Sequence, residues 1–292
     1  MINKWLYNAG AFFLYLISLL PLSVLYLISY VAYLFLFYVI KYRRHVVLKN
    51  LINSFPDKEL YELKQIEKKF YKYLADLFFE GIKMISASPQ YIFKRYTFKN
   101  TELLKSLEQE KQSFVMAVGH YGNWEWSVIT TPMVTSALPL IIYKPLNNRT
   151  FDGIFRKIRE KSGAKMIAMR IALRKMLQYK NQQTCTVFAA DQTPAMDGAY
   201  AWLNFLNQPT AVFTGIEKIA KSMNYPVVFC DINVNGRGRY HAEFIEITHT
   251  PRETEDLEIT EKYIRLLEKT INQRPEYWLW SHKRWKIKPK DN

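Results

Sequence analysis

The chain has 292 residues, of which 49% are hydrophobic and 23% are charged. This balance excludes an intrinsically disordered protein, and the length predicts one large domain or two small ones. Lysine and arginine total 41 against 26 aspartates and glutamates, which gives a formal net charge of +15. We expect so basic a surface to meet anionic partners: nucleic acid, anionic lipid or a phosphorylated ligand.

The two cysteines, Cys185 and Cys230, lie in apolar runs of the sequence. We therefore expect buried, reduced thiols rather than a disulfide. No CxxC or Cys/His spacing predicts a zinc site. The sequence gives no reason to expect a metal or another cofactor.

Residues 5–40 contain no charged side chain. A membrane-spanning helix needs about 20 apolar residues, so this run is long enough to anchor the protein in a membrane. Pro21 leaves two forms open: one tilted spanning helix, or a kinked pair with one helix lying along the membrane. We therefore expect residues 1–40 to be a membrane anchor, either spanning or monotopic. Basic residues then follow, and the positive-inside rule places the chain from residue 41 in the cytoplasm; they are Lys41, Arg43, Arg44 and Lys49.

Residues 41–111 are predicted to be helical. Apolar residues recur three and four positions apart between Asp57 and Ser86, which is typical of one face of a helix. A shorter helix is predicted over Thr101–Glu110, directly before the pattern changes.

From residue 112 short apolar runs alternate with helical stretches, which predicts an α/β fold with a mostly parallel sheet flanked by helices. The region 112–292 is expected to form one catalytic domain together with 41–111. The predicted strands are Ser113–Val118, Leu138–Tyr143, Thr184–Ala190, Val227–Val234 and Ala242–Thr248. The predicted helices are 123–135, 149–162, 169–180, 212–224 and Thr260–Gln273.

His120 and Glu125 follow the first predicted strand, where ligands bind in open α/β sheets. On a regular helix residues five apart diverge, so the two can meet only if His120 lies in the preceding turn. A carboxylate bonded to one imidazole nitrogen fixes the tautomer and raises the basicity of the other nitrogen. We therefore predict that Glu125 orients His120 as a general base. The backbone amides at this helix start can stabilise an oxyanion, which makes Gly122 and Asn123 candidates for substrate binding.

Four other segments of the chain carry recognisable residue patterns. One lies before His120 and contains Arg43-Arg44, Leu48, Asn50-Leu51 and Phe55-Pro56. After Glu125 come a segment with Tyr143-Lys144-Pro145, Asn147-Asn148, Arg159, Ser162 and Met166, then Phe188 to Gln192, and finally Pro275 to Lys286. With His120 and Glu125, this series resembles the lipid A biosynthesis acyltransferases, which are bacterial inner-membrane enzymes. It also resembles the wider glycerolipid acyltransferase superfamily, whose catalytic motif is H-x4-D/E.

The resemblance implies that Arg159 and Asp191 are catalytic together with His120 and Glu125. Arginine suits phosphate recognition, so we assign Arg159 to the acceptor or to the phosphopantetheine arm of the donor. Asp191 is expected to orient Arg159 or to organise the site. The further candidates for substrate binding are Lys144, which stands where arginine is usual, and Asn147, Asn148 and Arg156.

The predicted function is transfer of a fatty acyl chain from acyl carrier protein to a hydroxyl of a lipid A precursor. The resemblance implies these two partners, together with inner-membrane lipids, and a site on the cytoplasmic side of the bacterial inner membrane. One alternative is another acceptor, such as a glycolipid of the phosphatidylinositol mannoside type. Another is a non-catalytic, membrane-tethered protein that binds polyanions; we find no nucleic-acid-binding motif and expect no nucleic-acid partner.

Overall fold

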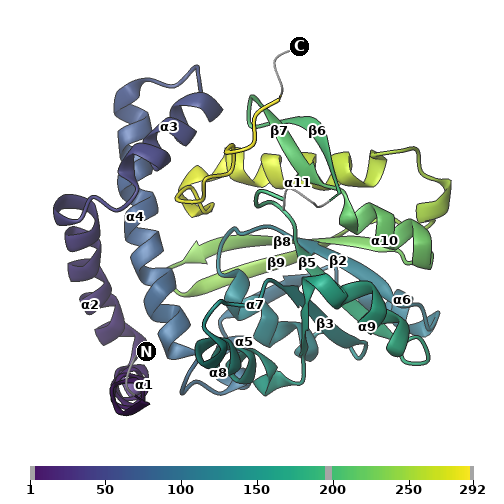
Figure 1. Ribbon diagram of the computed structural model, residues 1–292, viewed down its shortest axis with the longest axis horizontal. Coiled ribbons are helices and arrows are strands. Elements are labelled where there is room, and N and C mark those ends of the chain that lie inside the picture. Colours follow the sequence, from purple (N-terminus) through teal and green to yellow (C-terminus); the bar gives the residue numbers. More distant parts are fainter. Residues whose placement is uncertain (1–3, 195–198, 290–292) are drawn as a thin grey trace.

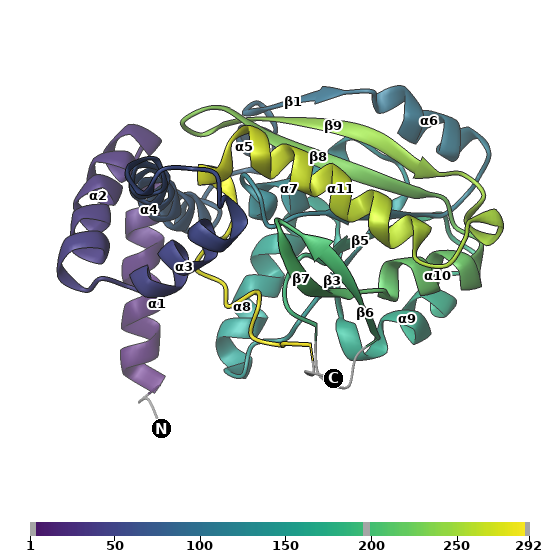
Figure 2. The ribbon, with the colours of Figure 1, turned by 90° about the horizontal axis from the view of Figure 1, so that it is seen from above.

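The computed structural model describes residues 4–194 and 199–289, and two groups of elements are evident (Figure 1). A helical group at one end begins with the apolar N-terminus and is backed by one long helix. An α/β body built on a seven-stranded sheet makes up the rest. The long helix α4 (Leu60–Lys83) lies between the helix α2 (Leu22–Leu34) and the sheet in both ribbon views (Figure 2).

The apolar run forms two helices, α1 (Lys4–Leu19) and α2 (Leu22–Leu34), with Pro21 at the start of the second. Proline lacks an amide hydrogen and fixes its φ angle, so it fits a helix start and interrupts a continuous helix. The apolar run is therefore two helices and not one continuous helix, and whether it spans a membrane or lies along it stays a prediction. Among the described residues one helix is long and apolar enough to cross a membrane, Leu22–Val39, with a mean hydropathy of 2.0.

The helices α1 and α2 are joined to α4 by polar contacts as well as apolar ones. Lys83 is buried, and its Nζ donates to the carbonyl oxygens of Ser18 and Leu20, each at 2.9 Å. These carbonyls stand at the end of α1, where the helix leaves its last acceptors unpaired and favours a positive charge. The first helix is thus held by its end.

A π-helical stretch and several shorter helices complete the helical region. The chain leaves α2 through a π-helical stretch, Phe35–Val39, and then forms α3 (Arg44–Ser54). After α4 come α5 (Pro89–Phe93) and α6 (Thr101–Gln109). The helices predicted over Asp57–Ser86 and Thr101–Glu110 are confirmed.

The seven strands lie in the order β1-β9-β8-β2-β5-β3-β4. The five from β8 to β4 run parallel, β9 is antiparallel to β8, and β1 is parallel to β9. The mostly parallel α/β sheet predicted from the sequence is confirmed. The strands are β1 (Tyr96–Lys99), β2 (Phe114–Val118), β3 (Leu138–Tyr143), β4 (Lys165–Ala168), β5 (Thr184–Ala189), β8 (Val227–Gly236) and β9 (Arg239–Thr248).

Helices cover both faces of this sheet (Figure 1). The central strand β2 is buried throughout, and its alternate residues enter two different apolar clusters. Val115 and Ala117 share one cluster with residues of α10 and α11, whereas Phe114 and Met116 share the other with residues of α6 and α7. The remaining helices are α7 (Trp124–Thr130), α8 (Arg149–Arg159), α9 (Ala172–Gln178), α10 (Gly215–Met223) and α11 (Glu258–Gln273).

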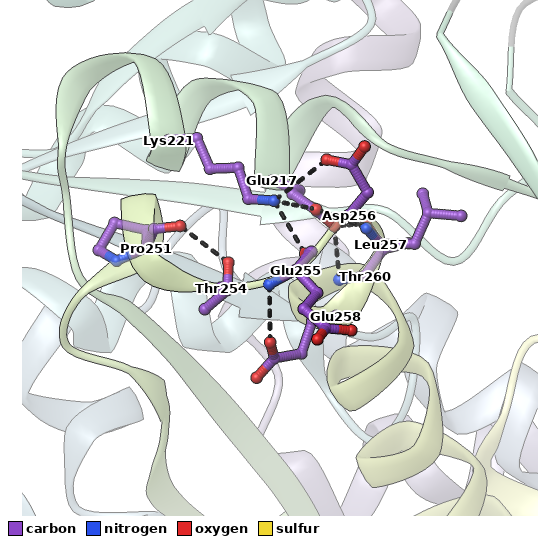
Figure 3. A network of polar contacts seen from close by, with 9 residues as sticks. All are labelled: Glu217, Lys221, Pro251, Thr254, Glu255, Asp256, Leu257, Glu258 and Thr260. Carbon is purple, nitrogen blue, oxygen red and sulfur yellow. Dashed lines mark hydrogen bonds and ion pairs between the residues drawn. The ribbon is translucent and has the colours of Figure 1, made fainter.

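Helix α11 begins without a capping side chain of its own, because its N-cap residue is Leu257. The buried carboxylate of Glu217, on α10, takes that place (Figure 3). It accepts hydrogen bonds from the backbone nitrogens of Leu257 and Thr260, at 2.7 and 3.1 Å, and from the Thr260 hydroxyl at 2.7 Å. Lys221 also pairs with it at 3.0 Å. An anion at a helix N-terminus satisfies free amides and opposes the helix dipole, so Glu217 joins α10 to α11.

An antiparallel hairpin, β6 (Tyr200–Phe205) and β7 (Gln208–Phe213), stands beside the sheet. The sequence analysis missed it and expected a helix from residue 212. The hairpin turn is Leu206-Asn207, and both residues have positive φ angles. Two-residue hairpin turns usually contain glycine, often as Asn-Gly. Because Leu206-Asn207 has no glycine, nothing in the sequence clearly predicted a turn here.

Candidate active site

His120 and Asp191 are brought together by the register of two neighbouring strands. Val118, the last residue of β2, pairs with Ala189, the last residue of β5, and the strands are parallel. His120 and Asp191 each lie two residues beyond these ends. The ring Nδ1 of His120 is 2.6 Å from Oδ1 of Asp191. The backbone nitrogen of His120 also donates to both carboxylate oxygens, at 3.1 and 3.0 Å.

The Asp191 carboxylate is buried, with 1% of its side chain exposed. In addition to the bonds from His120, it accepts a hydrogen bond from the indole Nε1 of Trp278 at 2.8 Å. Burial by itself raises the pKa of Asp191, but the charge of His120 and these hydrogen bonds outweigh it and lower the pKa to about 2. Asp191 is therefore an anion at neutral pH and a strong acceptor.

This anion determines which nitrogen of His120 can act as a base. An anionic carboxylate accepts the Nδ1 hydrogen, which leaves the lone pair on Nε2. Among the described residues Nε2 has no hydrogen-bond partner, and 16% of the His120 side chain is exposed. The ring packs edge-on against Trp124, with 5.1 Å between ring centroids.

Glu125 and Arg159 form a second pair. Glu125 lies in the first turn of α7, and Arg159 is the last residue of α8. The guanidinium donates two parallel bonds to the carboxylate, Nε at 2.8 Å and Nη2 at 2.7 Å. Both side chains are partly exposed, by 27% and 19%. This bidentate geometry fixes the plane of the guanidinium and leaves its outer edge for another acceptor.

The structure thus corrects the partners predicted for these four residues. The sequence analysis placed Glu125 on His120 and offered Asp191 as a partner of Arg159. In the described residues Asp191 bonds His120, and Glu125 bonds Arg159. The physical reason is the sheet: strand register sets Asp191 against His120, whereas the turn of α7 aims Glu125 at α8.

Gly122 and Asn123 both make hydrogen bonds within the fold, and their contact with substrate stays a prediction. The amide of Gly122 donates to the carbonyl of Tyr277 at 3.1 Å. Its φ is +55°, and a Cβ there would stand 2.8 Å from a methyl group of Ile232, so only glycine fits. Asn123 is fully buried, and its Oδ1 accepts from the Trp126 amide at 2.8 Å, which caps α7.

The other candidates for substrate binding lie at the same edge of the sheet as His120. Lys144, Asn147 and Asn148 are exposed in the connection between β3 and α8. Asn148 accepts from the Phe151 amide at 3.3 Å, at the start of α8. Arg156 is half-exposed and lies 3.6 Å from Glu160. Their contacts with substrate stay a prediction.

The C-terminal aromatic segment closes the back of the site, a role that the sequence analysis did not assign to it. Trp278, Trp280 and Trp285 are buried, so these three side chains pack on the body. It is held by α3: Asn50 donates to the carbonyls of Trp280 and His282, at 2.9 and 3.1 Å. No spacing in the sequence could reveal that Trp278 bonds Asp191.

Arg284 and His282 stand behind Asp191 in this segment. Arg284 is 1% exposed, and none of its three guanidinium nitrogens has a hydrogen-bond partner among the described residues. Burial lowers the pKa of Arg284 to about 10, against the opposing influence of Asp191. Burial also lowers the pKa of His282 to about 4. His282 is therefore neutral at pH 7, and Arg284 supplies the positive charge behind the carboxylate.

A cavity of about 360 Å³ lies between α4, the β8–β9 turn and the segment that follows α11. Tyr73 and Tyr277 line it, and both contact Gly122 through hydrogen bonds. Its charged lining includes Lys69, Arg237 and Arg274. The cavity adjoins the turn that carries His120, although His120 does not line it.

Two comparisons bear on the identity of this site. The family model described as bacterial lipid A biosynthesis acyltransferase matches residues 1–287. A search of curated proteins found no match.

Proposed function

The chain belongs to the bacterial lipid A biosynthesis acyltransferase family and is an acyltransferase, and from this premise we propose that it transfers a fatty acyl chain from acyl carrier protein to a hydroxyl of a lipid A precursor. The observation that supports this reaction best is the imidazole of His120, oriented by the buried Asp191 and left with a free Nε2. The net charge of +15 suits both reactants, since a carrier protein is acidic and a lipid A precursor carries phosphates.

The reaction follows from the position of this base. Nε2 of His120 takes the proton of the acceptor hydroxyl while its oxygen attacks the thioester carbonyl carbon. The tetrahedral intermediate collapses, the carbon–sulfur bond breaks, and His120 returns the proton to the departing thiolate. One ester and one thiol are formed, and the enzyme regains its starting state. Asp191 stabilises the imidazolium that exists between the two proton transfers.

Arg159 is proposed to bind a phosphate of the acceptor or of the phosphopantetheine arm. Glu125 holds its guanidinium in place by two bonds and so presents the free edge. Arg156 and Lys157 share the last turn of the same helix and add positive charge there. In this proposal Glu125 acts through Arg159 rather than through the histidine.

We place the protein at the cytoplasmic face of the bacterial inner membrane. Helix α2 exposes large apolar side chains, among them Leu27 by 69% and Val31 by 62%, on the side away from α4. Such surface is costly in water and stable in lipid. The basic residues that follow the apolar run support a cytoplasmic position of the catalytic body, by the positive-inside rule.

The test is an in vitro assay with purified protein, acyl carrier protein thioesters of several chain lengths and a purified lipid A precursor, read by mass spectrometry. We expect one added acyl chain. His120→Ala and Asp191→Asn should each lower kcat at least about 10³-fold, because the base or its tautomer is lost. His249→Ala is the matched control, since His249 is a surface histidine that pairs with Glu110.

Two results would overturn the proposal. Full activity of His120→Ala would contradict the role of His120 as general base. No transfer to the precursor by the wild-type protein would contradict the proposed acceptor. In a deletion strain, loss of one acyl chain from lipid A supports the proposal. An unchanged lipid A profile would direct the search to glycolipid acceptors instead.

A further inference from the structure

A buried carboxylate on α4, Glu80, joins elements that are far apart in the sequence. Only 1% of Glu80 is exposed. Its Oε1 accepts from the Tyr26 hydroxyl of α2 at 2.6 Å. Its Oε2 accepts from the Tyr240 hydroxyl of β9 and from Nδ2 of Asn123, each at 2.5 Å. Three donors on one buried carboxylate fix its position and theirs.

The Asn123 end of this network holds the start of α7. Asn123 caps α7 through Oδ1 while its Nδ2 bonds Glu80, so both ends of its amide are used. The indole of Trp126 donates to the backbone carbonyl of Glu80 at 3.1 Å. Asn123 lies between His120 and Glu125 in the chain. Glu80 therefore helps to hold the turn between these two residues, together with the Tyr96 hydroxyl, which donates to the carbonyl oxygen of Asn123.

The Tyr26 end reaches the anchor. Tyr26 is on the face of α2 that packs against α4, together with Ser29 and Tyr33. Leu27 and Val31 are on the exposed, apolar side of the same helix. A change in how α2 seats on α4 thus acts directly on one of the three donors of Glu80.

We propose that Glu80 is a positioning residue that couples the seating of α2 to the turn carrying His120. The anchor helix is then a working part of the active site and not only a tether. This inference rests on the proposed function for its kinetic consequence. Loss of the Tyr26 hydroxyl leaves Oε1 without its donor, lets the carboxylate turn, and shifts Asn123 and the start of α7.

The chain provides a matched control in a second link between α2 and α4. Ser29 of α2 donates to Asp76 of α4, and Arg237 donates two further bonds to Asp76, at 2.7 and 2.6 Å. Arg237, in the β8–β9 turn, also donates to the carbonyl oxygen of Tyr26 at 3.0 Å and lies over its ring. Among the described residues this link makes no hydrogen bond to Glu80 or to α7. Tyr26→Phe and Ser29→Ala each remove one hydroxyl from a carboxylate of α4, but only the first removes a hydrogen bond from Glu80.

The experiment compares the two variants as full-length protein in detergent. Tyr26→Phe should lower kcat about tenfold with KM for the acyl donor unchanged, because a small misplacement of catalytic groups is costly. Ser29→Ala should stay within about twofold of the wild-type kcat, since it leaves the three hydrogen bonds of Glu80 in place. Asn123→Ser, which keeps a capping oxygen but cannot reach Glu80, should behave like Tyr26→Phe.

Hydrogen exchange of the peptide spanning residues 119–127 gives a readout that does not depend on acyl transfer. It should be faster in Tyr26→Phe than in Ser29→Ala at similar thermal stability. Equal exchange and equal kcat in the two variants would overturn the coupling. If the wild-type protein transfers no acyl chain but the exchange rates differ as expected, the proposed function fails while the coupling stands.

Discussion

Two buried carboxyl groups, Asp191 and Glu80, differ in protonation because their surroundings differ. Asp191 is surrounded by donors, which keep its pKa near 2 in spite of burial. Glu80 also accepts three bonds, yet burial dominates and raises its pKa to about 7, with Asp76 adding to the rise. One carboxylate is therefore a permanent anion, whereas the other titrates near neutral pH.

The raised pKa of Glu80 predicts a pH dependence of stability. A carboxyl group whose folded pKa lies above its unfolded value of 4.5 favours the folded state in its protonated form. That contribution is complete below pH 4.5 and is lost as the pH rises through about 7. The free energy of unfolding of the wild type, minus that of Glu80→Gln, should therefore decrease between pH 5 and pH 8, by at most about 3 kcal/mol.

Denaturant unfolding of both proteins at the two pH values measures this difference. Using the glutamine variant as reference cancels the titration of other groups that the substitution leaves alone. A difference that stays constant, or that grows with pH, would contradict the assignment of a raised pKa to Glu80.

At the scale of elements, helix ends determine how the body is assembled. Glu217 serves as the cap of α11 from a neighbouring helix. The far end of α11 leads into the segment that delivers Trp278 to Asp191. A contact at one end of α11 thus supports the geometry at the other.

Glu217→Ala should lower the free energy of unfolding by about 2 kcal/mol, because buried amides and a hydroxyl lose their acceptor. Glu258→Ala is the control on the same helix: its carboxylate is more exposed and accepts one backbone bond from Glu255. Denaturant titration should show a much smaller loss for this control. Equal losses would mean that the capping contact is not what stabilises the α10–α11 junction.

Periodicity alone predicted most of the elements. The five strands expected from apolar runs all exist, and so do the two helices of the helical region. The missing strands were β1 and β4, which have four residues each, and the hairpin with its Leu206-Asn207 turn. Four residues are too few to show a period, and a turn without glycine gives no signal.

The sequence proposed the members of the candidate site but not how they pair. Motif resemblance supplied His120, Glu125, Arg159 and Asp191 individually. Which carboxylate meets which cation depends on the register of β2 with β5 and on the direction of α7. Long-range features of this kind, like the contact of Trp278 with Asp191, have no counterpart in local sequence.

At the scale of the whole molecule, many of the exposed large apolar side chains belong to the N-terminal helices. The helices α1 and α2 stand at one end, with α4 between α2 and the sheet (Figure 2). Leu27 and Val31 project from that end, whereas the site lies in the body. This arrangement suits a protein that works on a lipid at a membrane surface.

The double variant Leu27→Lys, Val31→Lys should release the protein from membranes, since each lysine in a bilayer costs about 3 kcal/mol. The fraction that sediments with membranes after an alkaline carbonate wash measures the effect. Tyr61→Lys is the control, because Tyr61 is 72% exposed but belongs to α4. Continued sedimentation of the double variant would show that α2 does not hold the protein in lipid.

The bond from Trp278 to Asp191 has a consequence for the biosynthesis of the enzyme itself. A ribosome makes α1 and α2 first and Trp278 much later. The nascent chain therefore contains its apolar N-terminal helices long before the indole of Trp278 can bond Asp191. The candidate site is therefore complete only after the C-terminal segment has been made and has folded onto the body.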